Sequence, residues 1–155
     1  MRSWAPRGHT PVLQYHFNWH QLSAIAGITF VRFYFRLFPG AIGGPQVIEF
    51  LQALGRQIRR KVLVIWDGLP AYRSRLVRDY VDRLNGAVQL EYLPAYAPEL
   101  NPTEYIWGQL KQYELGNFCT RTFGELTHQA RNRLRSIQHR RTLIAAFWKQ
   151  AELPL

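Results

Sequence analysis

Cysteine is almost absent from this sequence, since Cys119 is the single one in 155 residues. An internal disulfide is therefore excluded, and a reducing cytoplasm suits the chain. Long apolar runs are also lacking, because no uninterrupted stretch approaches the ~18 residues of a membrane span. The opening residues, MRSWAPRGHTP, contain no apolar signal-peptide core. We therefore expect neither a membrane protein nor a secreted one.

Acidic residues are scarce: 10 Asp and Glu face 20 Lys and Arg, which gives a net charge of +10. Basic side chains that neutralise phosphates release condensed counterions, so this surplus favours nucleic acid as a partner. A basic surface that only keeps the protein soluble is the alternative. The length suits a single domain, residues 1–155, and the hydrophobic share of 47% excludes a disordered chain.

Strands are predicted from residue patterns in five segments. Apolar and polar residues alternate over 12–19, which indicates a half-buried strand, and 22–29 and 31–38 are rich in β-branched and aromatic residues. The run KVLVIW (61–66) is continuously apolar, which is typical of a strand buried on both faces in a parallel sheet. A further strand is predicted over 88–93.

Helices are predicted between and after the later strands. Apolar spacings of three and four indicate helices over 45–59 and 73–84, the latter with Leu76, Val77, Tyr80, Val81 and Leu84 facing inward. Asn101 and Pro102 suit the cap and first position of a helix that runs to about residue 115. Two more helices are expected over 123–139 and 141–152. The order predicts an α/β fold, with an antiparallel hairpin and parallel strands flanked by helices.

Two carboxylates stand where α/β proteins bind ligands. Asp67 follows the apolar run 61–66, and the carboxyl ends of parallel strands are the usual binding edge. A divalent metal would compensate its charge, although a turn Asp that caps the next helix is the alternative. Glu104 falls in the first turn of the helix capped by Asn101. It is a candidate metal ligand, or else the glutamate of a capping box.

Other candidate residues carry weaker signals. Glu99 lies in a proline-rich loop, and His16 and His20 have no third ligand in view. The C-terminal stretch is rich in arginine, which suits either a solvated face or a surface that follows DNA phosphates. As DNA contacts we single out five residues: Arg73, Arg131, Arg135, Arg140 and Arg141.

Two blocks resemble a known family. They are VIWDGLPAYRS (64–74) and YLPAYAPELNPTEYIWGQLK (92–111), and the opening WAPRGHTPVL (4–13) and LSAIAGIT (22–29) also agree. They resemble the DDE-type endonuclease domain of mariner-like bacterial insertion-sequence transposases. That family implies a ribonuclease-H-like fold and three carboxylates that bind two Mg²⁺ ions for DNA cleavage and joining near the nucleoid. Asp67 matches the second carboxylate and Glu104 the third.

The sequence departs from the family pattern at two places. Tyr72 stands where relatives often have His. The family's first Asp lies on a strand before the WAPRG block, yet no acidic residue precedes Glu49, which falls on a predicted helix. We therefore expect the first strand and first ligand to be missing. The chain would be part of a catalytic domain, inactive alone, with DNA, an upstream transposase fragment or a full-length transposase as partners.

Three hypotheses follow for function. The first is a fragment of a transposase catalytic domain. The second is a remnant without catalysis that binds DNA or dimerises with a full-length transposase. The third is an unrelated basic α/β nucleic-acid-binding protein, which the second block makes hard to sustain.

Overall fold

The computed structural model describes residues 21–94, 97–111 and 122–151. Five earlier expectations lie outside these residues: the strand over 12–19, the WAPRG block, His16, His20 and Cys119.

The first two strands form the predicted hairpin. Strand β1 (Leu22–Ile28) pairs antiparallel with β2 (Phe33–Pro39), and Ile25 lies opposite Arg36. The turn contains no Gly, Asn or Asp. Its closure comes from Thr29, whose backbone N–H donates to the Arg32 carbonyl at 2.8 Å and whose hydroxyl accepts from the Arg32 N–H at 3.0 Å.

The second pair of strands is parallel, as predicted. Helix α1 (Gly44–Ile58) leads into β3 (Val62–Trp66), helix α2 (Arg75–Asp82) follows, and β4 (Val88–Tyr92) pairs with β3 so that Trp66 lies opposite Tyr92. The two pairs are separate sheets, since no strand within the described ranges joins β1 to β3. One edge of β1 and one edge of β3 therefore have no strand partner within those ranges.

The C-terminal part is helical. A short 3₁₀ turn, η1 (Pro98–Leu100), precedes α3 (Pro102–Gln109), and α4 (Phe123–Gln138) and α5 (Arg141–Gln150) follow. Residues 112–115 of the predicted third helix lie outside the described ranges. None of the described helices is both long and apolar enough to cross a membrane.

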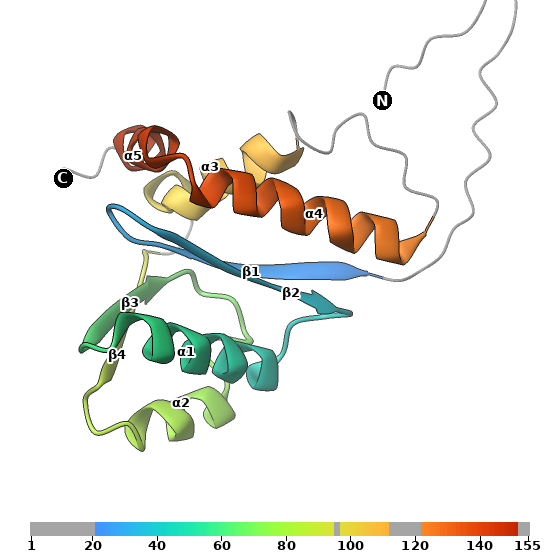
Figure 1. Ribbon diagram of the computed structural model, residues 1–155. Helices are drawn as coiled ribbons and strands as arrows, with labels where there is room; N and C mark the ends of the chain where they lie inside the picture. Colours follow the sequence, from blue (N-terminus) through green and yellow to red (C-terminus); the bar gives the residue numbers. More distant parts are fainter. Residues whose placement is uncertain (1–20, 95–96, 112–121, 152–155) are drawn as a thin grey trace, which may run out of the picture.

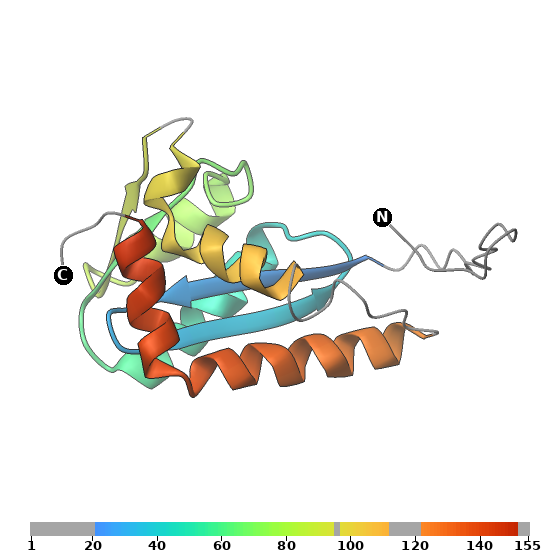
Figure 2. The same ribbon diagram turned by 90° about the horizontal axis from the view of Figure 1, so that it is seen from above.

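The helices lie on opposite sides of the hairpin (Figure 1). Helix α1 and then α2 lie on one side, and α3, α4 and α5 on the other, with α4 running along the hairpin (Figure 2). Each side has its own core. One joins Ile25 and Tyr34 to Val47, Leu51, Trp66 and Val77, and the other joins Phe33 to Ile106, Leu134, Ile144 and Phe147.

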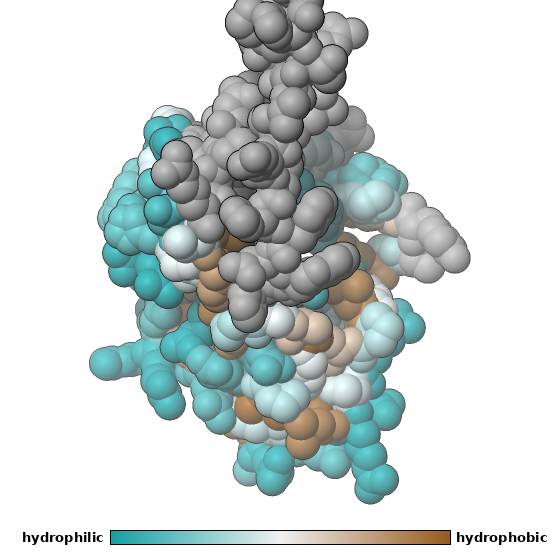
Figure 3. Space-filling model, turned by 90° about the vertical axis from the view of Figure 1, so that its right-hand side faces the viewer, coloured by the Kyte–Doolittle hydropathy of each residue, from teal (hydrophilic) through white to brown (hydrophobic). Residues whose placement is uncertain are grey.

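Two burial predictions are wrong. Strand β3 is buried on one face only: Trp66 is 9% exposed, whereas Leu63 and Ile65 are 55% and 58% exposed. Helix α1 and α2 cover the Trp66 face, and no described residue seals the other. Helix α2 begins at Arg75 rather than Arg73, and it buries Val77 while Leu76 stays exposed. Figure 3 shows one face of the molecule, which is largely hydrophilic and carries small hydrophobic patches.

Candidate active site

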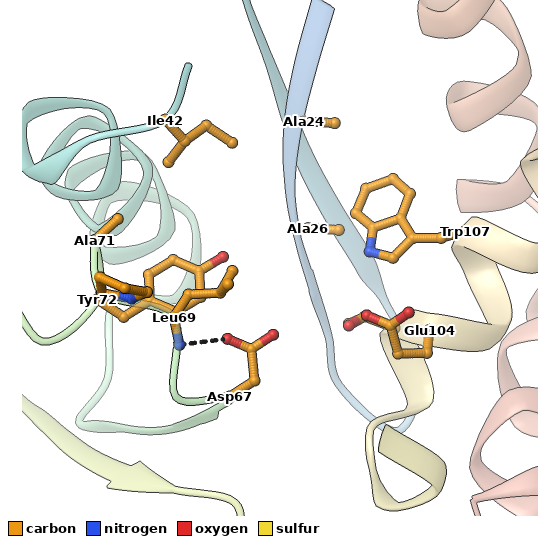
Figure 4. Close-up of a pocket in the computed structure, with 11 residues that line it drawn as sticks. Ala24, Ala26, Ile42, Asp67, Leu69, Ala71, Tyr72, Glu104 and Trp107 are labelled. Carbon is orange, nitrogen blue, oxygen red and sulfur yellow. Dashed lines mark hydrogen bonds between the residues drawn. The ribbon is translucent and has the colours of Figure 1, made fainter. Parts of the chain in front are cut away.

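A pocket of about 330 Å³ opens between the hairpin, the end of β3 and the start of α3. Asp67 and Glu104 approach it from opposite walls, and their carboxylates point toward one another (Figure 4). The floor is formed by small side chains of β1. The pocket is lined by Ala24, Ala26, Ile42, Asp67, Leu69, Pro70, Ala71, Tyr72, Thr103, Glu104 and Trp107.

Asp67 is positioned by the strand it follows. Its neighbour Trp66 is buried, and the Trp66 carbonyl accepts from the Leu93 N–H at 2.9 Å, which extends the pairing with β4. The Asp67 Oδ1 atom accepts from the Leu69 N–H at 3.2 Å. The Asp67 side chain thus closes a turn, which agrees with the first part of the alternative to metal binding, a turn Asp that caps the next helix. It does not cap the next helix, because Ser74 is the N-cap of α2.

Glu104 is held by the first turn of α3. Asn101 is the helix cap, and its side chain accepts from the Thr103 N–H at 3.1 Å. The Asn101 backbone N–H donates to the Pro98 carbonyl at 3.0 Å. That donor is the one a capping-box glutamate would accept from, so the capping-box alternative is wrong. The Glu104 carboxylate is directed into the pocket instead.

The same turn is fixed to a distant helix. The Tyr105 hydroxyl contacts two carbonyls, those of Glu99 at 3.2 Å and Gln150 at 3.1 Å. Ile106, the next residue, is fully buried in the core shared with α4 and α5. Glu104 therefore projects from a turn whose neighbours are held on both sides.

Tyr72 lies in the pocket beside Asp67. Its ring stacks on Trp66, with centroids 4.6 Å apart and planes 5° from parallel. Burial, and after it the negative charges of Asp67 and Glu104, together raise the pKa of the Tyr72 hydroxyl to about 12. At neutral pH the Tyr72 phenol is thus uncharged, so it can donate a hydrogen bond but adds no negative charge to the pocket.

The donor set suits a hard divalent cation. Carboxylate oxygens are the ligands that Mg²⁺ prefers, and it commonly takes one or two of them and completes its shell with water and phosphate oxygens. No group of three or more His, Cys, Asp or Glu side chains within the described ranges could hold a metal ion. Asp67 and Glu104 therefore fit part of a metal centre.

The other predicted residues do not line the pocket. Glu99 is exposed on η1, and Glu49 on α1 forms an ion pair with Arg36, so neither joins the two acids. Arg131 and Arg135 are exposed on α4, and Arg140 and Arg141 are exposed at the start of α5. None of them lines the pocket. Arg73 follows Tyr72 in the loop before α2.

Sequence reasoning missed Trp107, Ala24 and Ala26 as parts of the pocket. Trp107 lies three positions after Glu104, which puts both on one face of α3, so helical spacing could have indicated it. The alanines belong to β1, and no local pattern says which sheet face will meet a distant helix.

Comparisons with known proteins identify the family and the fold. The family described as DDE superfamily endonuclease matches residues 1–127. No match was found among curated proteins.

Solved structures share the fold. The Mos1 mariner paired-end complex with Mn is 20% identical with a TM-score of 0.64, and the match covers 98% of this chain and 46% of that one. The Mos1 strand transfer complex is 19% identical with a TM-score of 0.66, and the match covers 98% of this chain and 45% of that one. The Mos1 transposase catalytic domain with raltegravir and Mg is 20% identical with a TM-score of 0.63, and the match covers 89% of this chain and 72% of that one.

The chain thus spans less than half the length of the first two relatives. At these identities the likeness shows the fold. It confirms the mixed α/β class that the residue patterns predict and the ribonuclease-H-like form that the family resemblance implies. Because the family match extends over most of the sequence, the chain belongs to the DDE superfamily endonuclease family.

Proposed function

We propose that this chain forms part of the catalytic domain of a DNA transposase, with Asp67 and Glu104 as ligands of divalent metal ions in DNA strand cleavage and transfer. One observation carries the proposal. Two acids from a strand end and a helix start, far apart in the sequence, face each other across one pocket in a DDE superfamily endonuclease. Among the Mos1 structures that share the fold, one is a paired-end complex with Mn and another is the catalytic domain with raltegravir and Mg.

Asp67, Glu104 and Tyr72 each have a distinct part in that chemistry. Bound Mg²⁺ ions would polarise the phosphate and activate water or a 3′-hydroxyl. Asp67 accepts from the Leu69 N–H through Oδ1, which leaves Oδ2 for a metal. Glu104 offers both oxygens from a fixed helix turn. Tyr72, neutral below a pKa of about 12, can donate to a phosphate oxygen or to a carboxylate.

With two carboxylates in the pocket from the described part of the chain, we expect metal affinity to be weak and cleavage by this chain alone to be absent. A two-metal site needs a further acidic ligand that bridges the ions. A partner polypeptide, such as an upstream transposase fragment or a full-length transposase, would supply it, and DNA in the cytoplasm would be the substrate.

The test is a cleavage assay with DNA that carries the ends of the element around the gene, in Mg²⁺ or Mn²⁺. We expect no cleavage by the chain alone. We also expect calorimetry to detect Mn²⁺ binding by the original chain. Asp67→Asn and Glu104→Gln should each abolish that binding. Glu99→Gln is the matched control, since it removes a nearby exposed acid outside the pocket. Equal Mn²⁺ binding by all three variants would refute the assignment of Asp67 and Glu104.

A second candidate function rests on the exposed arginines. A chain with net charge +10 and Arg131, Arg135, Arg140 and Arg141 on one solvent-facing segment could bind DNA without cutting it. It would then act by competing with a full-length transposase for DNA or by dimerising with it. Salt-dependent DNA binding without cleavage, even with a complementing upstream fragment present, would favour this candidate. Cleavage restored by the fragment and lost in Asp67→Ala would exclude it.

A further inference from the structure

Arg73 has a defined place at the edge of the pocket wall. It belongs to the loop between β3 and α2, where three successive backbone hydrogen bonds fold residues 69–74 into tight turns. They are Tyr72 N–H to Leu69 O at 3.0 Å, Arg73 N–H to Pro70 O at 3.2 Å, and Ser74 N–H to Ala71 O at 3.4 Å. The backbone that holds Arg73 is therefore as well defined as a helical turn.

The guanidinium of Arg73 lies between an aromatic ring and a glycine. It is 4.9 Å from the centroid of the Tyr92 ring, within the range of a cation–π contact. On the side of Gly68, a Cβ atom would come within 3.0 Å of the Arg73 Nη2 atom. Gly68 directly follows Asp67, so the guanidinium lies next to the backbone of a pocket carboxylate.

Tyr92 is itself part of a stack of aromatic rings. Its ring centroid is 6.4 Å from that of Trp66, which stacks on Tyr72 in the pocket. Trp66 and Tyr92 are parallel-strand partners at the ends of β3 and β4. A continuous series of rings thus connects the pocket to Arg73, and the register of the sheet sets its geometry.

The charge of Arg73 finds no counter-ion in the described part of the chain. Among residues 21–94, 97–111 and 122–151, no carboxylate forms an ion pair with it, and its side chain is exposed. A cation–π contact occupies none of the guanidinium N–H donors, and the fork of those donors matches a phosphate.

We propose that Arg73 binds a phosphate group of the DNA strand that enters the pocket, and that Tyr92 and Gly68 act as positioning residues for its guanidinium. The inference rests on the proposed function and extends it, since it assigns a phosphate subsite beside Asp67. A structural role is the competing explanation, in which Arg73 only ties the loop to β4 through Tyr92.

DNA affinity as a function of salt separates the two explanations. The probe is a fluorescein-labelled duplex with one single-stranded end, titrated by anisotropy between about 50 and 200 mM salt. We expect Arg73→Ala to weaken binding about fivefold to tenfold and to lower the slope of log affinity against log salt by about 0.7–0.9, the loss of one phosphate contact. Arg73→Lys keeps the charge and should restore the slope, with affinity still below that of the original chain.

The positioning role of Tyr92 is tested by a double-mutant cycle. Tyr92→Leu should weaken binding about twofold to threefold and Tyr92→Phe should not, because the ring and not the hydroxyl meets the guanidinium. In the Arg73→Ala background, Tyr92→Leu should have no further effect. Additive losses would mean that Tyr92 contacts DNA directly, which would overturn its role through Arg73.

The control is Arg56→Ala, an exposed arginine in the last turn of α1, the helix that leads into the opposite end of β3 from Asp67. Thermal unfolding checks that each variant remains folded. If Arg73→Ala and Arg56→Ala change affinity and salt slope equally, the phosphate subsite is refuted while general DNA binding stands. If the unmodified chain does not bind the probe at low salt, both the subsite and the proposed function fail.

Discussion

The two sheets of the molecule differ in how they are covered. The β1–β2 hairpin has a core on each face, with α1 on one side and α3, α4 and α5 on the other. The β3–β4 pair packs against α1 and α2 on one face, and its other face exposes Leu63 and Ile65. Most of the fully buried large side chains, Ile106, Leu134, Ile137 and Ile144, lie in the core of α3, α4 and α5.

The difference matters because the candidate site takes one acid from each region. Glu104 projects from α3 beside the fully buried Ile106, and Asp67 ends β3, whose far face is open. Their relative position therefore depends on how the hairpin holds the two regions together. Whatever covers the open face of β3 will also set the geometry of Asp67, since the side chains of Leu63, Ile65 and Asp67 share that face.

The largest expected effect is on stability in the closed region. Ile106→Ala removes a fully buried side chain and should lower the free energy of unfolding by about 3 kcal/mol. Leu63→Ala, at a side chain that is 55% exposed, should cost less than about 1 kcal/mol. Urea unfolding measures both. Equal losses would show that the Leu63 face of β3 is buried in solution, and the difference in coverage between the two sheets would then disappear.

Local patterns predicted much of the fold. The Asn101 cap and Pro102 start of α3 were located correctly, because capping is decided by residues within one turn. The hairpin and the parallel pair were also expected. Burial of Leu63 and Ile65 was predicted wrongly, since an apolar run indicates a strand but does not say what will cover each face. The separation into two sheets depends in the same way on partners distant in the sequence.

The candidate site was predictable where motifs carry it. Asp67 and Glu104 were named from a strand end, a helix start and the resemblance of two blocks. The stack of Tyr72, Trp66 and Tyr92, with Arg73 at its end, was not, because it follows from the β3–β4 register that pairs Trp66 with Tyr92. Register is a non-local property, and residues 64–74 alone do not determine it.

Tyr72 lines the pocket to which each of the two regions contributes one acid. Its pKa of about 12 should fall toward the usual 10 in Asp67→Asn and in Glu104→Gln, and remain above 10 because burial is the largest cause. NMR titration of ring-labelled tyrosine, with Tyr72→Phe to assign the signal, measures this. Glu99→Gln is the control. An unchanged pKa in Glu104→Gln would mean that α3 does not bring its acid to the pocket.

The raised pKa of Tyr72 also makes the free energy of unfolding depend on pH. A pKa raised in the folded state means that the neutral phenol is favoured there, so its contribution is fully present below about pH 10. It is lost as the pH rises toward 12. The unfolding free energy of Tyr72→Phe should therefore depend less on pH over this window than that of the original chain.

A smaller effect is expected at the cap of α3. Asn101→Ala removes the acceptor of the Thr103 N–H and should cost about 1 kcal/mol, whereas Asn101→Ser should retain most of the stability. Because Glu104 lies in that turn, Mn²⁺ affinity should fall in Asn101→Ala and recover in Asn101→Ser. Full Mn²⁺ affinity in Asn101→Ala would show that the fixation of Tyr105 to α5 suffices to hold Glu104.

The smallest effect belongs to the ion pair of Arg36 and Glu49, which links β2 to α1 on the surface. The two side chains are 41% and 50% exposed, so water and salt screen their attraction. A double-mutant cycle with both alanine variants should give a coupling energy of about 0.5 kcal/mol that disappears at high salt. A coupling well above about 1 kcal/mol would mean that this pair, and not the core of Ile25, Val47 and Leu51 beneath it, fixes α1 on the hairpin. The contrast between the two regions would then be one of surface charge as much as of burial.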